Sequence, residues 1–403
     1  MPPTSAPEED DELDLSRPPR PVHYAEQALL GALLLEPARL ADTSTLSADH
    51  FDSYHHATLF TAIASTPPPA PDPQVRDTAW MHTMLEQTRS RTPGPSAALL
   101  GETAWLNQVL KRARAQAPGL NPSYLHTLIQ VCPRPAHAAA YARMIRTDHA
   151  RRLLRRHAER LAHTSTDPAS PSPAADVLIQ ADTLGRVLDD LAGQFAPHPG
   201  SLPRTPNPPR LPKHVGAEEL EEERNLLATA TAYPRDVPQM RWLLAEDFIV
   251  PLHAALWQCI TALVHRGDMV DPITVLGEAQ HRGLLTDTLC ARDLIALVST
   301  PAASPEHWGE KILQRSLLAR AHAVAERITA YTDDPTNTPH QLITGSRRAL
   351  ADLHTLRTRW SRAITPAAEP PSRSPGAPHA RPAPPPRAAS PPAAVPTPVR
   401  THR

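Results

Sequence analysis

Apolar residues recur at helical spacing in several separate stretches of the chain. Leu29, Leu30, Leu33 and Leu34 form one such set near the N-terminus, and their spacing places them on one face of a helix. The longest pattern, in residues 136–163, is not interrupted by Gly or Pro. Runs of β-branched residues are scarce, so we expect an all-α fold. Helices are expected within residues 24–36, 54–64, 136–163, 174–195, 217–230, 247–266, 308–331 and 340–359.

Proline-rich stretches divide this helical pattern. The chain has 49 Pro and only 14 Gly, and the prolines are clustered. Prolines in a linker favour extended conformations, and ends that are poor in apolar residues cannot bury a core. We therefore expect a disordered acidic leader over residues 1–21, a helical domain over 22–195, a linker over 196–216, a second helical domain over 217–360 and a disordered basic tail over 361–403.

The two expected domains repeat one another. Residues 50–63 and 247–260 have nearly the same sequence at an offset of 197, and this match extends without a gap back to Glu26 and its counterpart Glu223. Later, the helix around Tyr141 matches the helix around Trp308 at an offset of 167. The smaller offset means that the first copy is longer in its middle. We infer two copies of one helical domain, with structural anchors at Phe51, His56, Phe60, Phe248, His253 and Trp257.

Neither histidine of the repeat lies in a recognisable catalytic pattern. We expect His56 and His253 to be half-buried and to bond a backbone carbonyl or a neighbouring helix, because no nucleophile or carboxylate partner is evident. His149, His157 and His163 lie on or near one helix but do not form an HExxH motif. No catalytic, cofactor-binding or metal-binding residue is predicted.

Charge is balanced overall but uneven along the chain. The formal net charge is −1, which gives no general signal for nucleic-acid binding. Arginines are dense in residues 143–160, where they form either a solvated helix face or a surface for a phosphate backbone or an acidic partner. The candidates for such contact are Arg152, Arg155, Arg156 and Arg160.

Composition also bears on compartment. The three cysteines are far apart and lack CxxC spacing, which argues against a disulfide framework and a zinc site. No stretch approaches 18 continuous apolar residues, so no membrane span is expected, and the acidic N-terminus is unlike a signal peptide. We expect a cytoplasmic protein, and the abundance of Ala, Pro and Arg favours a bacterial source.

These motifs resemble a known family. "PVHYAEQALLGALLLEP" and "LSADHFDSYHHATLFTAI" in the first copy, and "LLAEDFIVPLHAALWQCI" in the second, are similar to the N-terminal domain of DnaB-type replicative helicases. Gly267, Val270 and Asp271 fall where that domain has a Gly-x-x-Val-Asp signature, followed by Thr274 and Val275. The resemblance implies that each copy is a small helical head followed by a long helical hairpin through which family members pair.

The departures from the family shape the expected function. No Gly is followed by Lys, so the sequence contains no Walker A loop of the kind that the helicase ATPase domain uses. The first copy lacks the Gly-x-x-Val-Asp element, and the second lacks the Ala-Glu-Gln and Gly of the opening motif. The resemblance therefore implies a duplicated collar domain without a motor and without a cofactor.

We expect a non-catalytic, replication-associated interaction protein that binds a replicative helicase, a primase or both. One alternative is a motor-less subunit or remnant of an ATP-dependent helicase, and another is a DNA-binding accessory that uses the arginine-rich helix. The two hairpins are expected to pair within the chain, or between chains as a homodimer. The hairpin residues expected to make these contacts are Tyr141, Ile145, Leu153, Leu154, Leu161, Trp308, Leu313, Leu317, Val324 and Ile328.

Overall fold

The computed structural model describes residues 20–68, 97–195, 202–208, 216–285 and 290–365. These residues form α-helices and short 3₁₀ helices, and no β-strand occurs among them, so the expected all-α fold is confirmed. Most of the leader, most of the linker and the tail beyond residue 365 lie outside the described residues, and their expected disorder stays a prediction. The first helix begins at Pro21 and the last helix continues to Ile364, so the helical region extends slightly beyond the expected limits at both ends. Within the described ranges, no helix is both long and apolar enough to cross a membrane.

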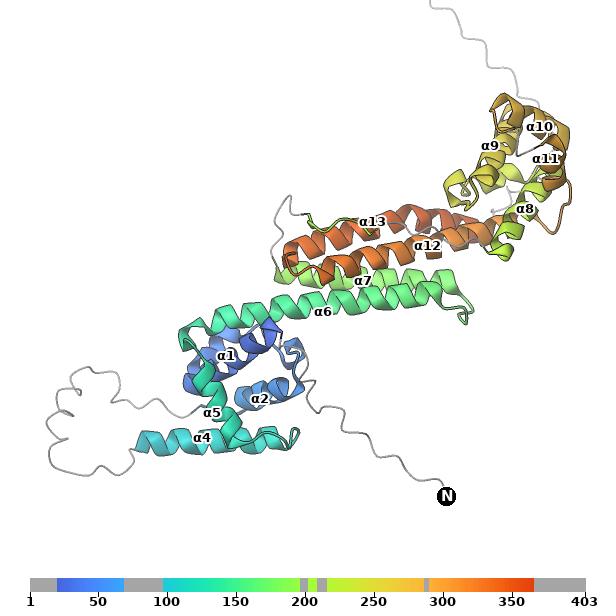
Figure 1. The fold of residues 1–403 in the computed structure, drawn as a ribbon. Helices are drawn as coiled ribbons and strands as arrows, with labels where there is room; N and C mark the ends of the chain where they lie inside the picture. The colour runs from blue at the N-terminus through green and yellow to red at the C-terminus, as the bar shows by residue number, and fades with distance from the viewer. Residues whose placement is uncertain (1–19, 69–96, 196–201, 209–215, 286–289, 366–403) are drawn as a thin grey trace, which may run out of the picture. The chain divides into compact units, whose positions relative to one another are not determined.

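The described residues of the first copy's head form four α-helices, which Figure 1 labels. They are α1 (Pro21–Leu35), α2 (Tyr54–Ser65), α4 (Ala97–Arg114) and α5 (Pro122–Val131), with 3₁₀ helices at Pro37–Thr43, Ala48–His50 and Pro135–His137. Helix α1 is buried along most of its length because α5, α2 and the following long helix all pack against it. The start of α5 is capped by Asn121, whose side chain accepts a hydrogen bond from the backbone nitrogen of Tyr124.

The head of the second copy follows the same order. It contains α8 (Ala217–Ala232), α9 (Pro251–Arg266), α10 (Pro272–His281) and α11 (Ala291–Leu297), with 3₁₀ helices at Val237–Met240 and Ala245–Asp247. Its Gly-x-x-Val-Asp motif is a helix-to-helix turn. Gly267 ends α9 in the left-handed region at φ 75°, and Asp271 begins α10 by accepting hydrogen bonds from the backbone nitrogens of Ile273 and Thr274.

Each head is followed by a hairpin of two long helices. Helices α6 (Ala138–Thr166) and α7 (Pro173–Gln194) form the first hairpin, and α12 (Pro305–Asp333) and α13 (Pro339–Ile364) form the second. These bounds lie within a few residues of the expected ones. The four helices lie side by side, with α6 against α12 as the most extensive contact and α7 against α13 beside it (Figure 1).

Two hydrophobic cores hold these elements together, and their boundary does not follow the repeat. The first core contains the head of the first copy and the start of α6, as far as Ile145. The second core begins at Ala150 and combines the rest of α6, α7, the second hairpin and the second head. Helix α6 therefore contributes to both cores, and both hairpins share a single one.

Candidate functional site

The contact between the two hairpins is mainly apolar. Leu154 and Leu161 on α6, and Leu317, Val324 and Ile328 on α12, are all fully buried in the shared core. Successive members of this row are four or seven residues apart along each helix, as expected for side chains on one helix face. Burying a Leu, Ile or Val side chain stabilises a fold by roughly 1.5–3 kcal/mol, so this row is a substantial contribution to holding the hairpins together.

Polar contacts at one end of the hairpin pair join the two copies. Arg151 of α6 donates hydrogen bonds to the backbone oxygens of Thr332 at 2.9 Å, Asp334 at 2.6 Å and Asn337 at 2.7 Å, which lie where α12 turns into α13. One turn further along α6, Arg155 lies 2.5 Å from a carboxylate oxygen of Asp333. Burial lowers the pKa of Arg151 below its ordinary value.

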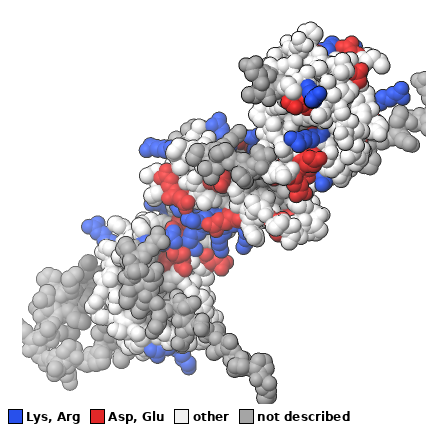
Figure 2. All heavy atoms as spheres, turned by 45° about the vertical axis from the view of Figure 1, so that its right-hand side comes forward, with Lys and Arg blue, Asp and Glu red and all other residues white. Residues whose placement is uncertain are grey.

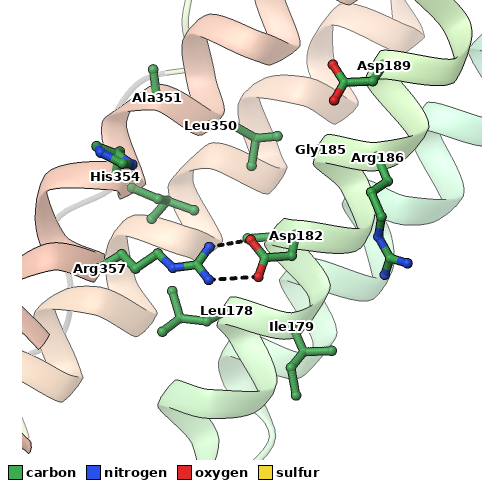
Figure 3. Close-up of a pocket in the computed structure, with 12 residues that line it drawn as sticks. Leu178, Ile179, Asp182, Gly185, Arg186, Asp189, Leu350, Ala351, His354 and Arg357 are labelled. Atoms are coloured by element: carbon green, nitrogen blue, oxygen red, sulfur yellow. Dashed lines mark hydrogen bonds and ion pairs between the residues drawn. The ribbon is translucent and has the colours of Figure 1, made fainter. Parts of the chain in front are cut away.

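The second helices of the two hairpins border an open groove (Figure 3). It has a volume of about 880 Å³ and an apolar floor that includes Leu178, Leu350 and Leu353. An ion pair crosses it between Asp182 and Arg357, where Oδ2 and Nη2 are 2.9 Å apart. A second ion pair joins Asp189, another residue of the groove, to Arg347 at 2.5 Å. The groove leaves apolar side chains in contact with solvent, including Ile179 at 57% exposure.

Most residues expected at the hairpin interface lie inside the shared core. Leu154, Leu161, Leu313, Leu317, Val324 and Ile328 are buried there, and Leu153 and Trp308 pack against it in part. Ile145 and Tyr141 lie elsewhere, because the start of α6 belongs to the core of the first head. The hairpins thus pair within one chain, and the buried faces are not exposed to another molecule in this fold.

A buried glutamate and histidine form the centre of each head. In the first copy, Nδ1 of His56 lies 2.6 Å from Oε2 of Glu26, and Nε2 lies 2.6 Å from the hydroxyl of Tyr124. Glu26 also accepts hydrogen bonds from the backbone nitrogens of Asp52 at 2.5 Å and Ser53 at 3.4 Å. One carboxylate therefore fixes the segment that leads into α2 against α1.

The second copy repeats this arrangement and adds an arginine. Nδ1 of His253 lies 2.9 Å from Oε2 of Glu223, which also accepts from the backbone nitrogens of Ile249 at 2.7 Å and Val250 at 3.3 Å. Arg315 of α12 donates to Glu223 at 2.8 Å and to Glu222 at 2.8 Å. The second head is thereby tied to its own hairpin through charge.

These pairs correct two expectations drawn from the sequence. His56 and His253 are not half-buried, since they are 1% and 2% exposed. Each also has a carboxylate partner, which the sequence reading missed. The signal was present, because glutamate and histidine are 30 residues apart in both copies. The four aromatic anchors are buried and lie ring against ring in each copy, as Phe51 with Phe60 and Phe248 with Trp257.

The geometry of these pairs indicates a structural role. Both rings and both carboxylates are enclosed, and each carboxylate is bonded to several donors, as buried charges require. Neither pair is among the residues that line the groove between α7 and α13. Among the described residues, no group of three or more His, Cys, Asp or Glu side chains is arranged to hold a metal ion.

The candidate arginines of α6 do not form one continuous basic face. Arg152 points back to the first head, where it donates to the carbonyl of His50 at 2.7 Å and pairs with Asp148 at 2.8 Å. Arg155 pairs with Glu159 and Asp333, whereas Arg156 and Arg160 are exposed. Figure 2 likewise shows Lys and Arg side chains interleaved with Asp and Glu side chains over this view of the molecule.

Comparison with known proteins identifies the repeated heads. The model of the DnaB-like helicase N terminal domain matches residues 18–67 and 216–312, which contain both glutamate–histidine pairs. The resemblance to this domain is confirmed. Hairpin α6–α7 and helix α13 lie outside the two matched segments.

A relative supports the same conclusion over part of the chain. The replicative DNA helicase DnaB of Mycobacterium leprae (strain TN) is 29% identical to it over 149 residues. The match covers 36% of this chain but only 23% of the length of that helicase. The chain is therefore related to replicative helicases through a DnaB-like N-terminal domain. No solved structure matches it.

Proposed function

We propose that this chain is a non-catalytic interaction protein of DNA replication, which presents a ready-made pair of DnaB-like N-terminal domains to a replicative helicase, a primase or both. The observation that carries the proposal is the pairing of α6–α7 with α12–α13 inside one chain, with both hairpins in a single core. A protein built in this way holds in one polypeptide a pair of hairpins that would otherwise need two chains.

The features of the heads support an interaction role. The enclosed glutamate–histidine pairs lock α2 to α1 and α9 to α8, which makes each head a rigid unit. Rigid surfaces lose little conformational entropy on binding, and this favours their use in recognition. The relative that matches these segments is named a replicative DNA helicase, which supports a partner from the replication machinery.

Light scattering on a size-exclusion column tests the proposal. The purified full chain is run alone, then mixed with the replicative helicase of the organism that encodes it, and then with the primase. We expect a monomer alone and a heavier joint peak with at least one partner. Failure to form a joint peak with either protein would contradict the proposed role, as would ATP hydrolysis by the purified chain itself.

A double variant separates protein contact from DNA contact. Arg156 and Arg160 are exposed on α6 and are the candidates for a phosphate backbone. In nuclease-treated samples, the double variant Arg156→Ala/Arg160→Ala is expected to keep the joint peak, because the proposed contact is between proteins. Loss of the peak in this variant alone, together with salt-sensitive binding of duplex DNA by the parent chain, would favour the DNA-binding alternative.

A further inference from the structure

A short part of the linker lies in contact with the second hairpin. Residues 202–208 have the sequence Leu-Pro-Arg-Thr-Pro-Asn-Pro and contain no helical turn. They lie against the end of the hairpin where α12 turns into α13. We name these residues the strap. The residues that receive it are named the turn site, and they are Tyr331, Asp334, Asn337, Gln341 and Gly345.

The centre of the turn site is a buried amide. Asn337 is only 2% exposed, although its side chain is polar. Its Oδ1 accepts a hydrogen bond from the backbone nitrogen of Arg204 at 3.2 Å, and its Nδ2 donates to the hydroxyl of Thr205 at 2.7 Å and to the carbonyl of Tyr331 at 3.0 Å. The amide is therefore satisfied only when the strap is in place, because two of its three partners belong to the strap.

Further hydrogen bonds extend along the strap on both sides of this amide. The Thr205 hydroxyl donates to Asp334 at 2.6 Å, and this bond, with those from Thr336, holds the pKa of Asp334 at about 2. Gln341 donates to the carbonyl of Leu202 at 3.0 Å, and the Tyr331 hydroxyl donates to the side-chain oxygen of Asn207 at 3.2 Å. The site contacts both the main chain and the side chains of the segment.

The shape of the site selects a proline. Pro203 lies directly over Gly345 of α13, where a Cβ atom would be 2.3 Å from Cγ of the proline ring. Only glycine leaves room for this approach. The aromatic ring of Tyr331 lies on the same side, 3.0 Å from the position of that Cβ atom. Packing of a proline against an aromatic side chain is a recurring way of recognising extended proline-containing peptides.

The turn site also depends on the pairing of the hairpins. Arg151 of α6 donates to the backbone oxygens of Asp334 and Asn337, the two residues whose side chains bond Thr205. Arg151 bonds the backbone carbonyls of these two residues, whereas the strap bonds their side chains. The first copy thus holds the turn in the conformation that binds the strap.

We propose that the turn site is a binding site for an extended, proline-containing peptide with the pattern Pro-x-Thr-x-Asn, and that its resident ligand is the strap of the same chain. Prolines restrict the unbound segment to extended conformations, so that less conformational entropy is lost on docking. A ligand tethered by a short linker has an effective concentration on the order of millimolar. The strap therefore occupies the site in preference to a free peptide.

A competition experiment on the full chain tests this assignment. The probe is a fluorescent peptide of residues 200–210, GSLPRTPNPPR, and its anisotropy is followed during titration with three proteins. They are the parent chain, a strap variant with Pro203→Ser, Thr205→Val and Asn207→Ala, and the same strap variant with Asn337→Ala added. We expect the peptide to bind the strap variant at least about tenfold more tightly than the parent chain, whose site is occupied in cis.

The third protein and a control peptide establish where the probe binds. Asn337→Ala is expected to abolish binding, since it removes the amide that contacts Arg204 and Thr205. If this variant fails to fold, as judged by its helical circular dichroism, the peptide with valine in place of Thr205 gives the same information without altering the protein. Equal binding to the parent and strap variants, no binding to the strap variant, or equal binding of both peptides would each overturn the proposal.

Discussion

The imidazole rings of His50 and His149 lie against each other, with 4.5 Å between their centroids. The same two positions are in contact in the second copy with different chemistry. At offsets of 197 and 167 they correspond to Asp247 and Ser316, and the Ser316 hydroxyl donates to Asp247 at 2.8 Å. The contact between head and long helix has thus been kept in both copies, while its residues have diverged.

Stability is expected to fall as the pH drops from about 6.5 to about 4 because of His149. Burial, together with the neighbouring His50, Arg152 and Arg156, lowers the pKa of His149 to about 4. Within this window the unfolded chain binds a proton at this histidine and the folded chain does not, so acid favours unfolding. We expect His149→Gln to reduce the fall in the free energy of unfolding between pH 7.5 and pH 5, measured with urea.

The matched control for this prediction is His163→Gln on the same helix. His163 is exposed near the end of α6, so its substitution is expected to leave the pH dependence unchanged. Identical pH dependence in the parent chain and in His149→Gln would show that His149 does not remain neutral in the fold.

The two glutamate–histidine pairs are expected to differ in their sensitivity to neutralisation. Glu223 bonds Arg315 in addition to His253, whereas the side-chain partner of Glu26 is His56. A hydrogen bond to a charged group contributes about 1.5–3 kcal/mol. We expect Glu223→Gln to lower the free energy of unfolding by about that amount more than Glu26→Gln. Amide hydrogen exchange in α8 and α9, compared with α1 and α2, checks that each loss of stability is local. Equal losses of stability in both variants would contradict the role of Arg315.

Gly31 is expected to be indispensable for the close approach of α5 to α1. A Cβ atom at this position would lie 2.1 Å from the backbone oxygen of Leu128 in α5. Overpacking of this kind costs about 1–3 kcal/mol, so we expect Gly31→Ala to destabilise the first head by that amount in urea unfolding. The matched control is Gly185→Ala on α7, where nothing lies within 4 Å of the added atom. There the better helix propensity of alanine is expected to stabilise by about 0.5–1 kcal/mol.

Arg151 is expected to be the most sensitive arginine of α6. Its substitution leaves the backbone oxygens of Thr332, Asp334 and Asn337 without their donor, and unsatisfied buried groups cost about 1–3 kcal/mol. We expect Arg151→Ala to lower the free energy of unfolding by that amount and to weaken the docking of the strap. Arg156→Ala, at an exposed position of the same helix, serves as the control and is expected to change stability by less than about 0.5 kcal/mol. A neutral Arg151→Ala would show that the hairpin ends are held by other contacts.

The sequence was sufficient to predict the four long hairpin helices and their order, whereas the head helices α4, α5, α10 and α11 were not predicted as separate elements. The helical period of the long helices is visible in the sequence, for example in Leu154 and Leu161 or in Leu317 and Val324. The bounds of these helices were therefore predicted to within a few residues. Periodicity reports which face of a helix is buried but not what covers it. The joining of both hairpins in one core, and the start of that core in the middle of α6, depended on contacts between distant residues.

The polar contacts were harder to foresee for a related reason. Glu26 was recognised as part of the repeat and His56 as an anchor, but a hydrogen bond across 30 residues has no local signature. The strap was harder still, because its prolines indicate a linker and carry no sign of the surface on which they rest. Asn337 and Gly345 are unremarkable in the sequence, and only the approach of Arg204 and Pro203 gives them a role.

The shared core has a consequence for the order of events during synthesis. When a ribosome has completed α7, every residue of the first copy exists, yet Leu154 and Leu161 still lack α12, which begins at Pro305. Domains generally fold as units as they emerge from the ribosome, and exposed apolar surface makes incomplete chains prone to aggregate. The first hairpin must wait for the second half of the polypeptide, so the duplicated protein reaches its native state in a single late step rather than one copy at a time.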